Sequence, residues 1–219
     1  MKFARFSLPP ERQRLALMGA ALFSPVLLAL SLTLLVPADR AGYPHPRMQI
    51  VSVTSAQRLE AVFERIDYAW PPTRSVPQLA LVHLPHDMAA LESDRRKALF
   101  LRALLPLVLA ENGRLQKERR WLEGVMALGQ RSPRVEARLR QLAREYGLGD
   151  PMQIDAALLA QLHERIDELP AGLVLSQAAI ESGWGTSRFS REANNLFGEW
   201  TYDEAKGIVP LRRAEGARH

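Results

Sequence analysis

The sequence predicts a mainly α-helical protein that begins with a membrane helix. One observation is the charge-free run of 24 residues from Leu15 to Ala38, which is long enough to cross a bilayer as a single helix. Another is the helical period of apolar side chains in most of the segments that follow. Prolines and glycines punctuate these segments, as at Pro71-Pro72 and Gly147. The 219 residues have room for one domain with appendages or for two small domains.

Composition narrows the classes of partner and of chemistry. The net charge is +5, from 29 Lys and Arg against 24 Asp and Glu, and this mild excess suits an anionic surface such as phospholipid or cell-wall polymer. It does not require nucleic acid, and we expect none as a partner. Because the chain has no cysteine, disulfides, thiolate metal sites and a cysteine nucleophile are all excluded.

Residues 1–38 are expected to form a basic cytoplasmic N-terminus and a membrane anchor. The basic residues lie on the N-terminal side of the apolar run, which holds that end in the cytoplasm and sends the rest of the chain outside. The apolar region of a secretory signal is shorter, roughly 7–15 residues, so a retained anchor is favoured. The alternative is a signal that is cut after the small-residue pattern Val36-Pro37-Ala38.

Residues 39–130 are expected to form a linker and a helical spacer. Thr54 and Gln57 match a capping box before a helix that Pro71-Pro72 ends, with one apolar face formed by Leu59, Val62, Phe63, Ile66 and Trp70. Residues 76–85 fit either an extended passage or a helical turn. Residues 93–129 read as one long helix, or two collinear ones, with a possible kink at Pro106. The charged part, residues 114–123, should be solvated.

His83, His86 and Asp87 could suggest a metal site within this region. Nothing in the sequence fixes a ligand geometry, and no fourth ligand is indicated. We therefore interpret this segment as a surface loop and expect neither a metal nor a cofactor.

Residues 131–219 begin with three successive helices. Ser132-Pro133 starts one that runs to Tyr146, and Asp155 caps a second that ends before Pro170. The third is almost wholly apolar through Ile180, so we expect it to be buried. It ends in Glu181, and two glycines then bracket Trp184.

The stretch AAIESGWGTSRFSREANNLFGEW, residues 178–200, closely resembles the signature of glycoside hydrolase family 73, the bacterial cell-wall glucosaminidases, and of its Bax-type members in Gram-negative bacteria. LVHLPHDM and KALFLRALLPLVLAEN extend the resemblance loosely upstream. The resemblance implies a lysozyme-like α+β fold and hydrolysis of the β-1,4 bond after N-acetylglucosamine in peptidoglycan glycan strands. It also implies that Glu181 is the catalytic acid and that residues 194–198 line the cleft. With the anchor, it places this part in the periplasm at the inner membrane, or free in the periplasm after cleavage.

The residues themselves suit this chemistry. A glycosidase needs a carboxylic acid that keeps its proton near neutral pH. Burial beside Trp184 and a place at the negative end of a helix dipole would both favour the neutral form of Glu181. For sugar contacts, the expected aromatic residues are Trp184, Phe197, Trp200 and Tyr202, and the expected amides are Asn194 and Asn195. Phe197 and Trp184 equally suit the core, and the two asparagines equally suit a turn or helix cap.

The second carboxylate of a glycosidase pair is not evident in this sequence. The resemblance places it in a β-hairpin just beyond His219, so we expect a C-terminally truncated domain with an incomplete β-lobe and weak or no activity. Two alternatives stay open. One is a lytic transglycosylase, and the other is a non-catalytic peptidoglycan-binding or scaffold protein.

Overall fold

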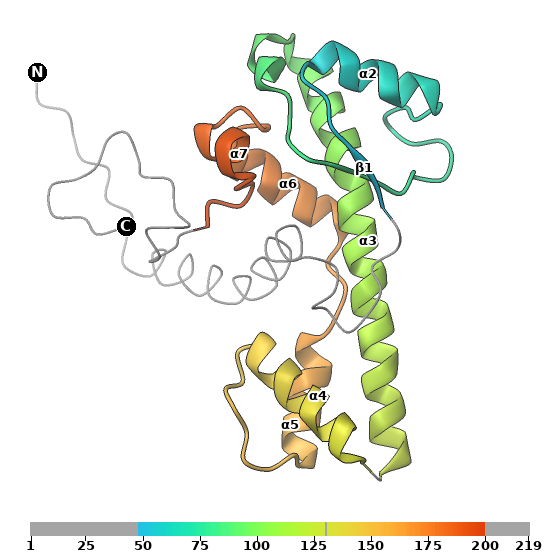
Figure 1. The fold of residues 1–219 in the computed structure, drawn as a ribbon, viewed down its shortest axis with the longest axis vertical. Helices are drawn as coiled ribbons and strands as arrows, with labels where there is room; N and C mark the ends of the chain where they lie inside the picture. The colour runs from blue at the N-terminus through green and yellow to red at the C-terminus, as the bar shows by residue number, and fades with distance from the viewer. Residues whose placement is uncertain (1–47, 130, 200–219) are drawn as a thin grey trace, which may run out of the picture. The chain divides into compact units, whose positions relative to one another are not determined.

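The computed structural model describes residues 48–129 and 131–199, and it is mainly α-helical, as predicted (Figure 1). The chain divides into two compact units. Residues 121–166 belong to the smaller unit, and residues 48–120 with 167–199 belong to the larger. The predicted anchor lies outside the described residues. No helix within the described ranges is both long enough and apolar enough to cross a membrane.

The larger unit begins with a strand and a short helix. Strand β1, Gln49–Val51, pairs in parallel with β2, Leu79–Leu81, so the ambiguous residues 76–85 include an extended segment. Helix α2, Ala56–Arg65, is capped by Ser55. The expected cap, Thr54, is therefore wrong by one residue. It also ends before Ile66, because the backbone turns left-handed at Asp67, with φ 53°.

Helix α3, Ser93–Leu128, is one continuous helix that includes Pro106. The 3-10 helix η1, His86–Ala90, leads into it. Leu99, Phe100 and Ala103 of α3 are fully buried, in a core that also contains Leu59 and Phe63 of α2. The apolar first part of α3 therefore contributes to the core of the larger unit.

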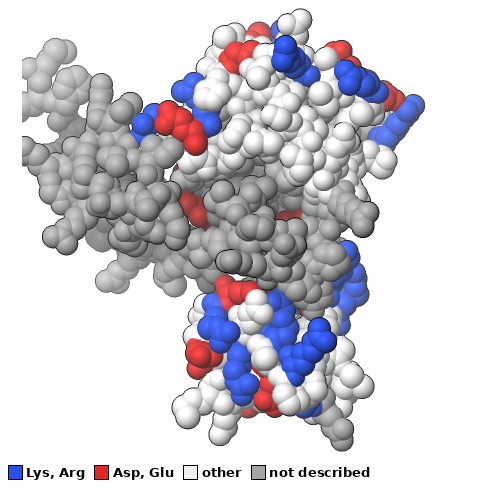
Figure 2. Space-filling view, in the orientation of Figure 1, with Lys and Arg blue, Asp and Glu red and all other residues white. Residues whose placement is uncertain are grey.

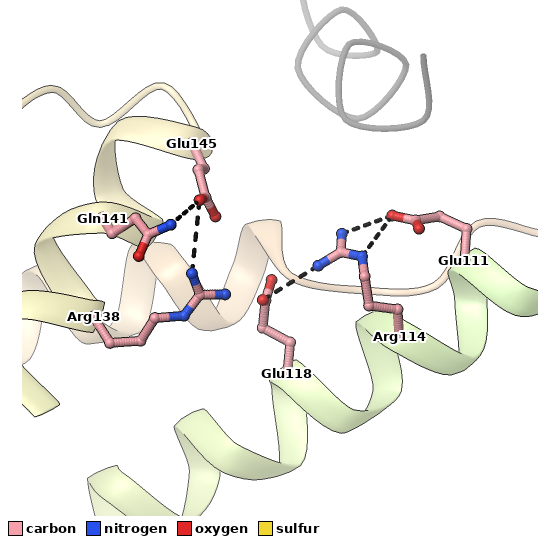
Figure 3. Close-up of polar contacts among 6 residues, drawn as sticks. All are labelled: Glu111, Arg114, Glu118, Arg138, Gln141 and Glu145. Atoms are coloured by element: carbon pink, nitrogen blue, oxygen red, sulfur yellow. Dashed lines mark hydrogen bonds and ion pairs between the residues drawn. The ribbon is translucent and has the colours of Figure 1, made fainter. Parts of the chain in front are cut away.

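The middle of α3 buries an ionic group of three residues, Glu111, Arg114 and Glu118 (Figure 3). Nη2 of Arg114 lies 2.6 Å from Oε1 of Glu111, and Nη1 lies 3.2 Å from Oε2 of Glu118. Glu118 is 0% exposed. The expectation that residues 114–123 are solvated is therefore wrong at Arg114 and Glu118, where side chains of opposite charge pair one helical turn apart.

The smaller unit contains the predicted helix pair, α4, Pro133–Glu145, and α5, Ala156–Arg165. Both predicted caps are confirmed. Oγ of Ser132 accepts from the amide of Val135 at 3.4 Å, and Oδ1 of Asp155 accepts from the amide of Leu158 at 2.8 Å. The side of this pair seen in Figure 2 mixes basic and acidic side chains, as a solvated face of amphipathic helices does.

Helices α6, Ala171–Ser182, and α7, Arg188–Ala193, return the chain to the larger unit. The Asn112 side chain holds the approach to α6 at both backbone groups of Leu169. Its Nδ2 donates to the carbonyl at 2.7 Å, and its Oδ1 accepts from the amide at 3.2 Å. A residue of α3 thus sets where α6 begins. These two compact units do not bear on the domain boundary that the sequence predicts at residue 131, which stays a prediction.

Candidate active site

Helix α6 has one buried face and one exposed face. Its buried positions are Val174, Leu175, Ala178, Ala179 and Ser182. On the other face, Ile180 is 72% exposed, and Glu181 beside it is also exposed. The expected burial of this helix all round, and of Glu181 with it, is therefore wrong. The apolar composition of α6 leaves a hydrophobic residue in solvent next to the carboxylate.

The end of α6 is a tight left-handed turn, as its two glycines predicted. Gly183, Trp184 and Gly185 have φ values of 58°, 59° and 76°. The amide of Trp184 donates to the carbonyl of Ala179 at 2.8 Å, and the amide of Gly185 donates to Oγ of buried Ser182 at 2.9 Å. A left-handed backbone at a bulky residue such as Trp184 costs on the order of 1–3 kcal/mol. Such strain persists where the surroundings determine the turn.

Close packing determines this turn at Gly185. A Cβ atom there would lie 2.6 Å from Cδ1 of Leu84 and 3.1 Å from Cδ2 of Phe100, so a larger residue does not fit. The Trp184 ring meets Phe100 edge-on, with centroids 5.7 Å apart, and Nζ of Lys97 lies 5.9 Å from its centroid. Trp184 is therefore partly a core residue and remains partly exposed.

Helix α7 ends at Asn194, which has φ 52° and forms the left-handed C-cap. Its Nδ2 donates to the carbonyl of Val82 at 2.9 Å, and its Oδ1 lies 3.4 Å from Nδ1 of His83. Both ends of the amide thus meet the segment after β2. The helix-cap interpretation of this asparagine is confirmed.

Asn195 closes the next loop onto itself. Its Oδ1 accepts from the amide of Glu199 at 2.9 Å, and its Nδ2 donates to the carbonyl of Glu199 at 2.8 Å. Within this loop the backbone of Gly198 lies against Glu181, where a Cβ atom would be 3.1 Å from Oε2 of the carboxylate. Two parts of the signature that are 17 positions apart therefore meet at the glutamate.

The remaining predicted residues are placed as follows. Phe197 is partly exposed, whereas its neighbour Leu196 is buried. Trp200 and Tyr202 lie outside the described residues. Asp87 accepts a hydrogen bond from the amide of Ala56 at 2.8 Å and so ties η1 to α2. Nowhere in residues 48–129 and 131–199 do three or more His, Asp or Glu gather as metal ligands would.

Sequence reasoning missed the contribution of Val82, His83 and Leu84. These residues precede the signature by about a hundred positions, yet they contact Asn194 and approach Gly185. The loose family resemblance of LVHLPHDM, residues 81–88, was the sequence feature that pointed to this segment.

Two comparisons with known proteins found similar sequences. Residues 157–215 match the glucosaminidase family described as mannosyl-glycoprotein endo-beta-N-acetylglucosaminidase. The chain is 41% identical over 106 residues to Protein bax of Escherichia coli (strain K12), an alignment that covers 47% of this chain and 38% of that protein. No solved structure matches the chain. The description of the matched family names a glucosaminidase, which is a glycosidase. Residues 157–215 of this chain are therefore similar to a glucosaminidase domain, and the chain shares 106 aligned residues with a Bax-type protein.

Proposed function

We propose that this protein hydrolyses the β-1,4 glycosidic bond after N-acetylglucosamine in peptidoglycan, with Glu181 as the general acid. The observation that carries the proposal is the setting of Glu181. It is exposed at the end of α6, with the Gly198 backbone against its carboxylate. Within the described part of the chain, no hydrogen bond or ion pair holds that carboxylate, so it is available to a substrate.

In the proposed reaction, the Glu181 carboxyl donates its proton to the bridging oxygen as the bond from that oxygen to C1 of N-acetylglucosamine breaks. The oxygen of a water molecule then bonds to C1, and the water releases one proton, which balances the proton that Glu181 donated and leaves a new reducing end.

The surrounding residues divide into sugar contacts and loop supports. Trp184 and Phe197 are partly exposed and offer aromatic surface to a sugar ring. The side-chain amide of Asn194 already bonds Val82 and meets His83, and that of Asn195 bonds the backbone of Glu199. In this proposal both asparagines therefore shape the cleft and do not bind acetamido groups. Trp200 and Tyr202 remain proposed sugar contacts.

The experiment that tests the proposal compares Glu181→Gln with Glu192→Gln in a cell-wall zymogram and a reducing-end assay. Glu192 is an exposed glutamate of the same signature, and it pairs with Arg188 one turn away in α7. We expect Glu181→Gln to lose at least about 100-fold in rate, as loss of a general acid does, and Glu192→Gln to keep the wild-type rate. A Glu181→Gln protein as active as the wild type would refute the proposal.

Mass spectrometry of the released fragments separates hydrolysis from the lytic transglycosylase alternative. Hydrolysis gives N-acetylglucosamine at a reducing end, whereas a transglycosylase gives an anhydro-sugar that is one water lighter. Binding to sacculi without any released fragment would instead support a non-catalytic wall-binding protein.

We also propose that the run from Leu15 to Ala38 anchors the protein in the inner membrane, with the catalytic part in the periplasm. The proposal rests on the length of the run and on the basic residues before it. Resistance of the membrane-bound protein to alkaline carbonate extraction is expected. Complete release into the soluble fraction would contradict the anchor.

A further inference from the structure

The segment after strand β2 contacts the signature at two points. At one end, Leu84 and Phe100 leave no room for a side chain at Gly185. At the other end, Val82 and His83 meet the amide of Asn194. A part of the chain that precedes the family match at residues 157–215 therefore supports the turn after Glu181 and also the loop that returns to it.

The contact between His83 and Asn194 specifies a hydrogen-bonding role for each atom. A backbone carbonyl can only accept, so the amide atom that faces the Val82 oxygen at 2.9 Å must be Nδ2. Oδ1 of Asn194 then faces Nδ1 of His83 at 3.4 Å and can only accept. Nδ1 of His83 must consequently carry the proton, whether the ring is neutral or charged.

The backbone that follows Asn194 connects this contact to Glu181. Asn194 is followed directly by the loop that Asn195 closes onto Glu199. That loop carries Gly198, whose backbone lies against the Glu181 carboxylate. A change in the position of Asn194 therefore moves the wall of the site beside the acid.

We infer that His83, in its Nδ1–H form, is a positioning residue of the active site, which acts through Asn194 on the loop beside Glu181. The inference rests on the proposed function for its effect on the rate, while the hydrogen bond itself can be measured separately. The rate of a reaction that depends on fixed geometry falls by up to about 100-fold when a group is displaced by 1 Å. We expect a fall of about tenfold in the rate here, because His83 acts through Asn194 and does not contact the substrate.

The hydrogen bond is tested by nitrogen NMR of the full chain labelled in its histidines. We expect His83 to populate the Nδ1–H tautomer and to shift toward Nε2–H in Asn194→Ala. His86, an exposed histidine three positions away, is the internal control and should not respond. A His83 ring that is mainly Nε2–H in the wild type, or that ignores Asn194→Ala, would overturn the inference.

The effect on the reaction is tested by kcat and KM on a soluble peptidoglycan glycan for four variants. His83→Ala should lower kcat about tenfold with KM within about twofold, because positioning acts on the transition state. His83→Asn keeps a donor where Nδ1 lies and should restore most of the rate, whereas His83→Gln places its donor near Nε2 and should not. His86→Ala should match the wild type.

A His83→Asn protein as slow as His83→Ala, or a His83→Gln protein as fast as the wild type, would overturn the positioning role. If neither the wild type nor any variant releases fragments, the proposed function fails. The tautomer of His83 and its response to Asn194→Ala would then still decide whether this hydrogen bond exists.

Discussion

Two glutamates of the larger unit differ in a way that reverses the expectation from sequence. Glu118, in the charged stretch of α3, is fully buried and pairs with Arg114. Glu181, at the end of the apolar helix α6, is exposed and has no polar partner among the described residues. A charge is buried in a protein when a partner of opposite sign accompanies it. The unpaired carboxylate is the one left accessible for chemistry.

The largest expected effect concerns the buried side of this comparison. Arg114→Met removes a buried cation that pairs with both Glu111 and Glu118, and it should lower the free energy of unfolding by about 3–5 kcal/mol, the usual result of removing one member of a buried ion pair. Chemical denaturation measures it. Arg120→Met, at an exposed position of the same helix, is the control and should change little. Equal free energies of unfolding for the two variants would show that this ionic group does not stabilise the fold.

The next effect concerns the exposed side. Gly198→Ala puts a methyl group 3.1 Å from Oε2 of Glu181 at a backbone φ of 67°, so it should displace the carboxylate or the loop. We expect about a tenfold loss of glycosidase rate. Gly124→Ala, at a helical glycine with open space around it, is the control and should keep the rate. Wild-type activity in Gly198→Ala would contradict the contact between loop and acid.

A third, smaller effect shows what burial does to an acid without an ionic partner. Tyr68 is 4% exposed, and its hydroxyl has no hydrogen-bond partner in the part of the chain that the structure covers. Burial raises the pKa of Tyr68 to about 12, against a smaller opposing effect of Arg102. Because the folded state holds this proton more tightly, its contribution to stability is present below pH 10 and is lost as the pH rises toward 12.

Thermal unfolding of the wild type and of Tyr68→Phe between pH 8 and pH 12 measures this loss. We expect the wild type to lose more stability than Tyr68→Phe above about pH 10, because phenylalanine has no proton to release. Below that pH, Tyr68→Phe should be as stable as the wild type or more so, since it removes a buried hydroxyl that lacks a partner. Parallel curves over the whole range would contradict the expected burial effect.

The smallest expected effect is on the stability of Glu181→Gln. Because Glu181 is exposed and has no polar partner in the described part of the chain, this change should alter the free energy of unfolding by no more than about 0.5 kcal/mol. Chemical denaturation of the two proteins checks it. A clear loss of stability would mean that Glu181 has a structural partner, and the contrast with Glu118 would disappear.

Local chemistry made much of the secondary structure predictable. Ser132 and Asp155 cap α4 and α5 as their sequence positions indicated, since a cap involves only the next three residues. The glycines on either side of Trp184 end α6 for an equally local reason, the need for a left-handed backbone. Thr54 and Ser55 are adjacent and both suit an N-cap, and here the prediction of Thr54 was wrong.

The sequence by itself therefore determined that Glu181 lies at the end of a helix and that a glycine turn follows. Only the tertiary structure decided that Glu181 is exposed, that Glu118 is buried, and that His83 meets Asn194. Helix propensity and capping act over one or two turns, whereas exposure depends on which face of each helix its neighbours cover. That depends on contacts between residues as far apart as 112 positions, which no local pattern encodes.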